Sequence, residues 1–359
     1  MSTYRFTQLD VFTQEPFAGN SLAVFPEAEG LSDELMMKIA REMNLSETVF
    51  VLKPNSKQQT ANSEQPEPDH SPSSVGDEGS QAKAVAVAKA AVEAEVAAEA
   101  EGPTVLRRLR IFTPAREIPF AGHPIVGTWN ALAREGVVPI PDGGNGWTRI
   151  HHEVGIGVLP VDIEFEEGAP VQVVMTQGKF EITAEIDDAH EQSELARALG
   201  LTTEEFDETL PIQVIATGLP FLAVPIRSLA DVGRCRVNAA LLTEIYQRAG
   251  ATGCQVFTRE TIEIGEARAH VRMFAPGDNI AEDPATGSAA GALGAYLVYH
   301  NASNAETIDG KVKFVLEQGD FIHRPSRIKL DVKGGAGAIE EVRVGGPSVV
   351  VAQGEVFVE

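Results

Sequence analysis

The sequence predicts an α+β protein made of two similar halves that enclose a cleft between them. Residues Arg110–Ile118 (RIFTPAREI) and Arg272–Ile280 (RMFAPGDNI) share Arg, Phe, Pro and Ile at the same spacing, 162 residues apart. Each copy leads into a glycine-containing loop and then into a helix-like apolar run. A repeat of this kind indicates a duplicated structural unit.

Shorter matches extend the repeat upstream. The apolar triplet Leu22–Val24 corresponds to Leu222–Val224, and the pair Val49–Phe50 corresponds to Val256–Phe257. Each half therefore reads in the order strand, helix, strand, strand, loop, helix.

The duplication also suggests where the domains begin and end. We expect a first domain over residues 1–145 and a second over 150–345, joined near the turn-rich stretch PIPDGGNG. Residues 346–359 are expected to form a terminal strand that returns to the first domain.

The first half carries an insertion. Phe50 lies 60 residues before Arg110, whereas Phe257 lies only 15 before Arg272, which leaves 45 extra residues and assigns the insertion to about 54–103. Its first part is rich in Pro, Ser, Gln and Glu and is expected to be disordered, and its alanine-rich second part predicts a solvent-facing helix over 82–101. It is either a tolerated surface insertion, removable without loss of the fold, or a partner-binding arm.

Composition excludes several classes of function. The chain has 359 residues, 43% hydrophobic, and a formal net charge of −23, which argues against nucleic acid or an anionic membrane as a partner. No run approaches the ~18 apolar residues of a membrane span, so we expect a soluble, cytoplasmic protein. Cys235 and Cys254 are too few for a disulfide framework or a cysteine-based zinc site.

The loop AEDPATGSAAG, residues 281–291, is the candidate site of the second half. Asp283 is either the N-cap of the following helix or a carboxylate that faces a ligand. Gly287 and Ser288 fall in the first turn of that helix, where free backbone N–H groups can bind a carboxylate. Glycine at this position could equally serve close packing.

His123, in AGHPIVG, occupies the equivalent loop of the first half. A lone histidine is more often structural than catalytic, but its symmetric position favours the cleft. Glu47, in NLSETVF, starts a strand and is either solvated or enclosed by the cleft, where burial would raise its pKa and make it a usable proton shuttle. His151 and His152 point to opposite strand faces, so we expect no metal site there.

Six ordered motifs carry a resemblance to a known family: DVFTQEPFAGNSLAVF, NLSETVF, RIFTPAREIPFAGHPIVGT, TGLPFLAV, RMFAPGDNIAEDPATGSAAG and EQGDFIHRPSRI. Together they closely resemble the PhzF family of phenazine-biosynthesis-type isomerases. The resemblance implies the diaminopimelate-epimerase-like fold, with two pseudo-symmetric domains that each wrap a mixed, barrel-like sheet around a central helix. It also implies a homodimer that uses no metal or organic cofactor.

The resemblance further implies roles for particular residues. The family's catalytic glutamate, histidine, aspartate and serine fall on Glu47, His123, Asp283 and Ser288, and the glycines whose amides hold the substrate carboxylate fall on Gly122 and Gly287. Glu47 would move a proton between carbons of a small carboxylated metabolite, while Asp283 could hold His123 in the required protonation state. Neither cysteine lies in the two loops, which disfavours the thiol chemistry of the related epimerases. The alternative is a non-catalytic relative that binds a carboxylated metabolite or a protein partner.

Overall fold

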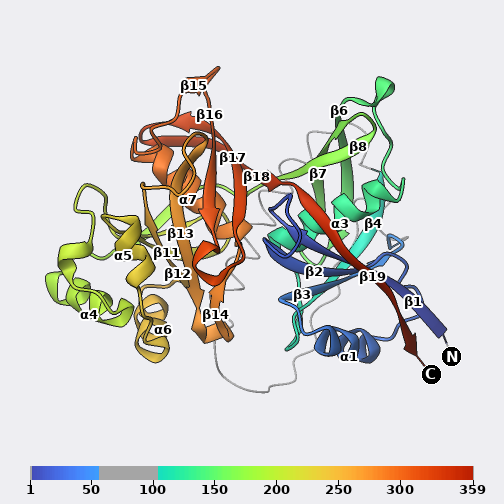
Figure 1. Ribbon diagram of the computed structural model, residues 1–359, viewed down its shortest axis with the longest axis horizontal. Coiled ribbons are helices and arrows are strands. Elements are labelled where there is room, and N and C mark those ends of the chain that lie inside the picture. The colour runs from blue at the N-terminus through green and yellow to red at the C-terminus, as the bar shows by residue number, and fades with distance from the viewer. Residues whose placement is uncertain (1, 56–103, 359) are drawn as a thin grey trace, which may run out of the picture.

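The computed structural model describes residues 2–55 and 104–358, so nearly all of the expected insertion at 54–103 lies outside the described residues. The described chain forms two lobes, each with a sheet and one long inner helix (Figure 1). The first lobe contains β1 (Ser2–Val11), β2 (Asn20–Phe25), α1 (Asp33–Met43), β3 (Glu47–Leu52), β4 (Val105–Phe112), β5 (Glu117–Ile118), α3 (Gly122–Arg134), η1 (Asp142–Gly144), β6 (Gly146–Val154), β7 (Gly157–Glu166) and β8 (Ala169–Thr176).

The rest of the chain forms the second lobe, apart from its last strand. Its elements are β9 (Glu181–Glu185), α4 (Ala189–Leu199), η2 (Thr203–Glu205), β10 (Gln213–Ala216), β11 (Pro220–Pro225), α5 (Leu229–Arg234), α6 (Ala239–Arg248), β12 (Gly253–Thr258), β13 (Ala267–Ala275), η3 (Pro276–Asp278), β14 (Ile280–Asp283), α7 (Gly287–Tyr299), β15 (Thr307–Ile308), β16 (Lys311–Gln318), η4 (Asp320–Ile322), β17 (Ser326–Gly335) and β18 (Ala338–Gly346), followed by β19 (Ser348–Val358).

The strand pairing repeats from one lobe to the other. In the first lobe β2 runs parallel to β3, β4 pairs antiparallel with β3 and parallel with β6, and β6, β7 and β8 follow as an antiparallel meander. In the second lobe β11, β12, β13, β16, β17 and β18 pair in the same order with the same directions. The pairing confirms the predicted α+β fold of two pseudo-symmetric halves.

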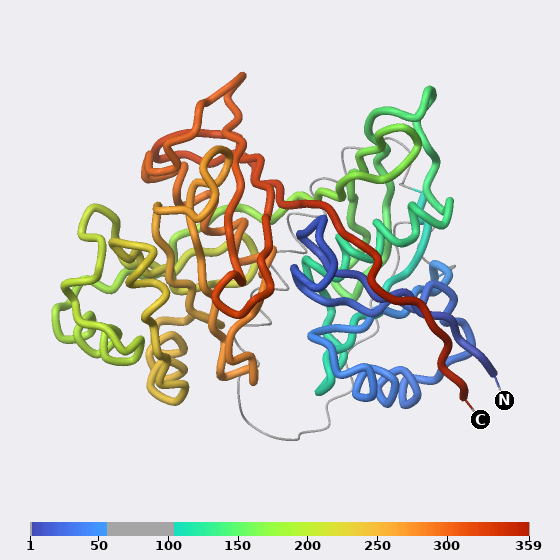
Figure 2. The backbone as a smooth tube through the Cα atoms, viewed as in Figure 1, coloured from blue at the N-terminus to red at the C-terminus, as the bar shows by residue number. Residues whose placement is uncertain are grey.

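Two contacts join the lobes into one continuous sheet. Strand β8 pairs antiparallel with β18, and the last strand, β19, crosses back to pair with β1 beside the N-terminus (Figure 2). Strands β6 to β8 belong to the first lobe by their pairing with β4, so this lobe continues to Thr176, beyond the boundary expected at residues 145–150. The second lobe then begins with β9.

Each sheet wraps around a buried helix. All residues of α3 from His123 to Ala133 are buried, and so are nearly all of α7 from Gly287 to Val298. A helix that is apolar or buried on every side lies inside a domain rather than on it. In the described part of the chain, no helix is long and apolar enough to cross a bilayer.

The repeated arginine has the same structural role in both halves. Arg110 donates through Nε and Nη2 to both carboxylate oxygens of Glu117, and Arg272 donates in the same way to Glu282. Each guanidinium also lies over the phenylalanine ring two residues further along its strand, 5.2 and 5.0 Å from the ring centroid. This two-point fork ties the strand to the short segment before the central helix in both halves.

Candidate active site

The four candidate catalytic residues lie at the ends of secondary-structure elements. Glu47 is the first residue of β3, and His123 is the second residue of α3. Asp283 is the last residue of β14, and Ser288 is the second residue of α7. Each lobe therefore contributes one strand end and one helix start.

Glu47 and His123 are in direct contact. Glu47 Oε2 lies 3.2 Å from His123 Nε2, with the two side chains 15% and 7% exposed. Neither atom makes a hydrogen bond with another described residue, although both are shielded from solvent. Buried polar atoms without a partner are costly, so this pair is suited to receive the polar groups of a ligand.

Asp283 is held by hydrogen bonds on both carboxylate oxygens. Oδ1 accepts from Asn20 Nδ2 at 3.0 Å, and Oδ2 accepts from the Thr286 hydroxyl. Its backbone carbonyl accepts from Gln318 Nε2 at 2.8 Å. Asn20 Nδ2 also lies 3.5 Å from His123 Nδ1, so Asn20 stands between the aspartate and the histidine.

Burial shifts the pKa values of Glu47, Asp283 and His123 away from their usual values. Burial, and to a smaller extent the charge of Asp283, raises the pKa of Glu47 to about 8. Burial raises the pKa of Asp283 to about 6, against the hydrogen bonds from Thr286 and Asn20, and lowers the pKa of His123 to about 3. At pH 7 Glu47 is mostly protonated, Asp283 is mostly ionised and His123 is neutral. At this pH one proton thus resides on the carboxyl group of Glu47, while that of Asp283 is ionised.

The helices at the site lack the side-chain caps of the other described α-helices. Capping hydroxyl, carboxylate or amide groups close α1, α4, α5 and α6 at Ser32, Asp188, Ser228 and Asn238. By contrast, α3 and α7 begin without a side-chain cap and without an acidic residue in the first turn. Their free backbone N–H groups and positive dipole ends are suited to bind an anion.

The two uncapped helix starts meet. A methyl group built onto Gly122 would lie 3.7 Å from the backbone nitrogen of Ser288. At Gly287 the same methyl group would lie 3.3 Å from the ring of Phe12, so glycine there also allows close packing. The contact brings His123 and Ser288 to one junction between the lobes, which the repeat in the sequence predicts.

One interpretation of Asp283 needs correction. The residue was a candidate N-cap, but α7 begins at Gly287 with Thr286 at its N-cap position, and Asp283 ends a strand instead. The effect of Asp283 on the protonation state of His123 stays a prediction, and the amide of Asn20 reaches both residues. Sequence reasoning did not single out Asn20 or Gln318, although both stand inside quoted motifs.

The remaining histidines and cysteines of interest lie away from this group. His152 is fully buried beside Trp129, with ring centroids 5.6 Å apart, and Glu153 accepts hydrogen bonds from Asn55. In the second lobe burial raises the pKa of the Cys235 thiol to about 11 and that of Cys254 further still. Both thiols are therefore protonated core groups.

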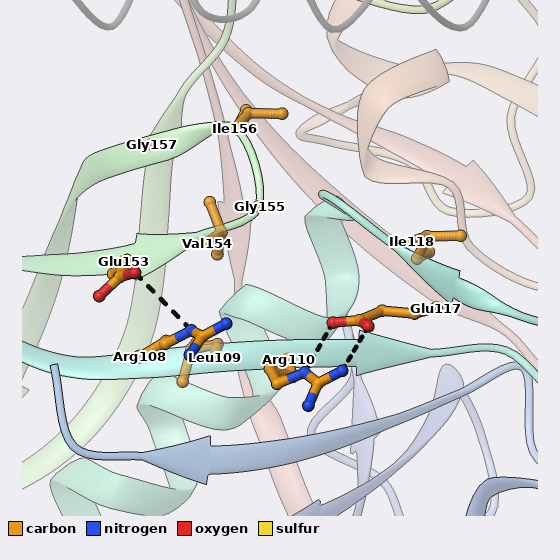
Figure 3. A pocket seen from close by; sticks show the side chains of 10 residues that line it. All are labelled: Arg108, Leu109, Arg110, Glu117, Ile118, Glu153, Val154, Gly155, Ile156 and Gly157. Carbon is orange, nitrogen blue, oxygen red and sulfur yellow. Dashed lines mark hydrogen bonds and ion pairs between the residues drawn. The ribbon is translucent and has the colours of Figure 1, made fainter. Parts of the chain in front are cut away.

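A surface pocket lies on the first lobe between β4, β5 and the turn from β6 to β7. Figure 3 shows its charged residues paired with one another, Arg110 with Glu117 and Arg108 with Glu153. None of its lining residues belongs to the Glu47, His123 and Asp283 group. A pocket whose charges already neutralise each other offers little to a charged ligand.

The two lobes, their inner helices and the meeting helix starts define the diaminopimelate-epimerase-like fold. A solved structure of a PhzF-family phenazine biosynthesis protein from Bacillus anthracis superposes with a TM-score of 0.75 over 100% of both chains, at 24% identity. A hydroxyproline epimerase from Agrobacterium vitis, 12% identical, shares the fold with a TM-score of 0.52 over 99% of this chain and 92% of its own.

Sequence relatives narrow the class to a family. The model of the PhzC-PhzF family, phenazine biosynthesis-like protein, matches residues 9–62 and 86–354. An uncharacterised isomerase of Clostridium acetobutylicum is 31% identical over 98% of this chain and 97% of its own. The trans-2,3-dihydro-3-hydroxyanthranilate isomerase of Pseudomonas aeruginosa is 29% identical over 99% of each chain. The chain belongs to the PhzC-PhzF family and is an isomerase.

Proposed function

We propose that this isomerase moves a proton between two carbon atoms of a small carboxylated metabolite, with Glu47 as the proton carrier. The observation that carries the proposal is the enclosed carboxyl group of Glu47, whose pKa is raised to about 8 and whose Oε2 makes no hydrogen bond with a described residue. A carrier must both accept and release a proton near the working pH, which an ordinary solvated glutamate does poorly.

The transfer consists of two balanced steps. In the first, ionised Glu47 takes a proton from a substrate carbon, so that a C–H bond breaks, a carboxyl O–H bond forms and the C–H electron pair shifts into the adjacent double-bond system of the substrate. In the second, the O–H bond breaks and an electron pair of that system forms a C–H bond with the same proton at another carbon. Neutral His123, 3.2 Å away, would orient a polar group of the substrate without competing for the proton.

The substrate's carboxylate would bind at the junction of α3 and α7. Both helix starts offer backbone N–H groups that no side chain caps, and they approach each other at Gly122 and Ser288. The Ser288 hydroxyl and Asp283 would bind further polar groups of the substrate. This arrangement would fix the orientation of the ring or chain relative to Glu47.

A non-catalytic relative would use the same helix starts to hold an anion. It would have no need for a carboxyl group with a raised pKa in the closed interior, because burying such a group is costly. The catalytic interpretation is therefore the stronger one. A homodimer and independence from cofactors remain predictions that rest on the family resemblance, and a cytoplasmic location remains a prediction from the sequence.

Incubation in deuterated water tests the proposal. Trans-2,3-dihydro-3-hydroxyanthranilate, the compound named for the Pseudomonas aeruginosa relative, is the first probe, followed by other cyclic carboxylated metabolites. We expect an isomerised product that carries deuterium at the carbon receiving the proton, except for the fraction that Glu47 returns internally. Calorimetric binding of a compound with neither isomerisation nor exchange would instead support the binding protein.

A further inference from the structure

Asn20 is the only described side chain seen to hydrogen-bond both to Asp283 and to the strand end next to Glu47. It is the first residue of β2 and is 1% exposed. Its Nδ2 donates to Asp283 Oδ1 at 3.0 Å and to the carbonyl of Ala285 at 2.9 Å, both in the second lobe. Its Oδ1 accepts from the hydroxyl of Ser46, the residue before Glu47, at 3.3 Å. One amide thus links the Asp283 loop of the second lobe to the start of β3 in the first.

The second lobe also holds the residues on both sides of Asn20. Arg324 donates through Nε to the carbonyl of Gly19 at 2.9 Å and through Nη2 to the hydroxyl of Ser21 at 2.7 Å. The same Nη2 lies 2.7 Å from Oδ1 of Asp10, whose side chain is 1% exposed. A charge pair with one buried partner and several hydrogen bonds fixes geometry well, so the start of β2 has little freedom to turn.

The segment that contains Arg324 holds the Asp283 loop as well. Gln318 Nε2 donates to the carbonyl of Asp283, and the Ser326 hydroxyl donates to the carbonyl of Pro284, both at 2.8 Å. Residues 318–326 therefore bind both the Asn20 segment, through Arg324, and the Asp283 loop, through Gln318 and Ser326. These contacts fix the distance between the Asn20 amide and the Asp283 carboxylate.

We infer that Asn20 is a positioning residue that keeps Asp283 ionised and at a fixed place opposite Glu47 and His123. An N–H group that donates to a carboxylate stabilises the charged form, and Asn20 has no charge of its own to repel Glu47. The ionised Asp283 in turn favours retention of the proton on Glu47. Asn20, together with Thr286, thus favours the ionised form of Asp283 in a pair of coupled acids that share a site.

The inference extends the proposed function but does not need turnover for its test. Asp283 can be followed directly by carbon-13 NMR of aspartate side-chain carboxyl groups, with its signal assigned from the Asp283→Asn variant. We expect Asn20→Ala to raise the pKa of Asp283 by about one pH unit, because a hydrogen bond to a charged group is lost. An unchanged Asp283 titration in folded Asn20→Ala overturns the inference.

A matched control separates this role from packing. Asn130 on α3 is also fully buried, and its Oδ1 accepts from Arg134 Nε at 2.8 Å, seven residues along the helix from His123. Asn130→Ala should lower the melting temperature and leave the Asp283 titration unchanged. A shift of equal size in both variants would show that buried asparagines act only through stability.

Asn20→Ser covers the case in which Asn20→Ala does not fold. The shorter side chain has one donor and cannot reach both Asp283 and Ala285, so a smaller rise in the pKa of Asp283 is expected, and no rise overturns the inference. With an identified substrate, a second fall of kcat/KM, which reflects protonation of Asp283 and lies below the limit set by Glu47, should begin at a higher pH in the same variants. If Glu47 does not carry the proton, only this kinetic test is lost. The NMR titration of Asp283 requires no substrate and still tests the role of Asn20.

Discussion

Glu47 Oε2 and His123 Nε2 lie 3.2 Å apart across the junction of β3 and α3, yet neither atom makes a hydrogen bond with another described residue. At pH 7 Glu47 is mostly protonated and His123 is neutral, so the carboxyl group faces a ring nitrogen that can accept its proton. A buried carboxyl group with a raised pKa beside a histidine is typical of a functional site. Turnover, its dependence on pH, the stability of the fold and substrate binding should therefore depend on this pair and on the helix starts beside it.

Replacing Glu47 by glutamine should separate binding from turnover. Glu47→Gln keeps the size and most of the hydrogen-bonding capacity of the side chain but cannot accept a proton near neutral pH. We expect substrate affinity within about threefold of the wild type and a fall in kcat of about 10²- to 10⁴-fold, the usual contribution of a positioned acid–base group. Steady-state kinetics and calorimetry measure both quantities.

The exposed Glu34 provides the control for this substitution. Its side chain is 76% exposed on α1, where it pairs with Lys38, and Glu34→Gln should leave kcat unchanged. Wild-type turnover in Glu47→Gln would remove Glu47 from the mechanism and would favour the metabolite-binding alternative.

The dependence of the rate on pH should follow the ionisation of Glu47. Because the carrier must be ionised to take the first proton, kcat/KM is expected to rise about tenfold for each pH unit below about 8 and then to level off. Initial rates at low substrate concentration between pH 5.5 and 9 would measure this profile. A plateau that already begins near pH 5 would show that Glu47 titrates like a solvated glutamate.

Much of this site could be predicted from the sequence because its residues follow local patterns. His123 and Ser288 stand at the starts of helices in two copies of one repeat, and an internal repeat is visible in a single chain. The sequence places Glu47 at a strand end, and the structure adds that its side chain is enclosed, which raises its pKa. Burial depends on the packing of both lobes, which no local pattern encodes.

Asn20 could not be identified in this way. Its partners His123, Asp283 and Ala285 lie 103, 263 and 265 residues further along the chain, so only the folded structure brings them together.

The N-cap of α7 also could not be identified from the sequence. An acid followed by proline fits a helix start well, but β14 pairs with β13 as far as Asp283 and delays the helix to Gly287.

Stability should also depend on pH through Glu47. Its pKa is raised in the folded state from 4.5 to about 8, so the folded protein binds the proton more tightly than the unfolded chain. The stabilisation is fully present below pH 4.5 and is lost as the pH rises through 8. Glu47→Gln has no carboxyl group to ionise, and its stability relative to the wild type should increase over this range by on the order of a few kcal/mol.

Urea unfolding of the wild type and Glu47→Gln at pH 5 and pH 9 measures this difference. The comparison within one pH cancels the contributions of the other titrating groups, which both proteins share. A difference in unfolding free energy that is the same at both pH values would mean that the pKa of Glu47 is not raised in the folded state.

Two substitutions at Ser288 separate the hydroxyl group from the backbone N–H group at the start of α7. Ser288→Ala removes only the hydroxyl, whereas Ser288→Pro also removes the N–H, and proline is tolerated in the first turn of a helix. If backbone N–H groups bind the substrate carboxylate, Ser288→Pro should raise KM about tenfold above that of Ser288→Ala, because a hydrogen bond to a charged group is lost. The matched control is Ala240→Pro, at the same position of α6, whose cap Asn238 binds the next residue, Leu241. That change should leave KM unaltered, and equal KM values for the two Ser288 variants would show that this N–H group does not contact the carboxylate.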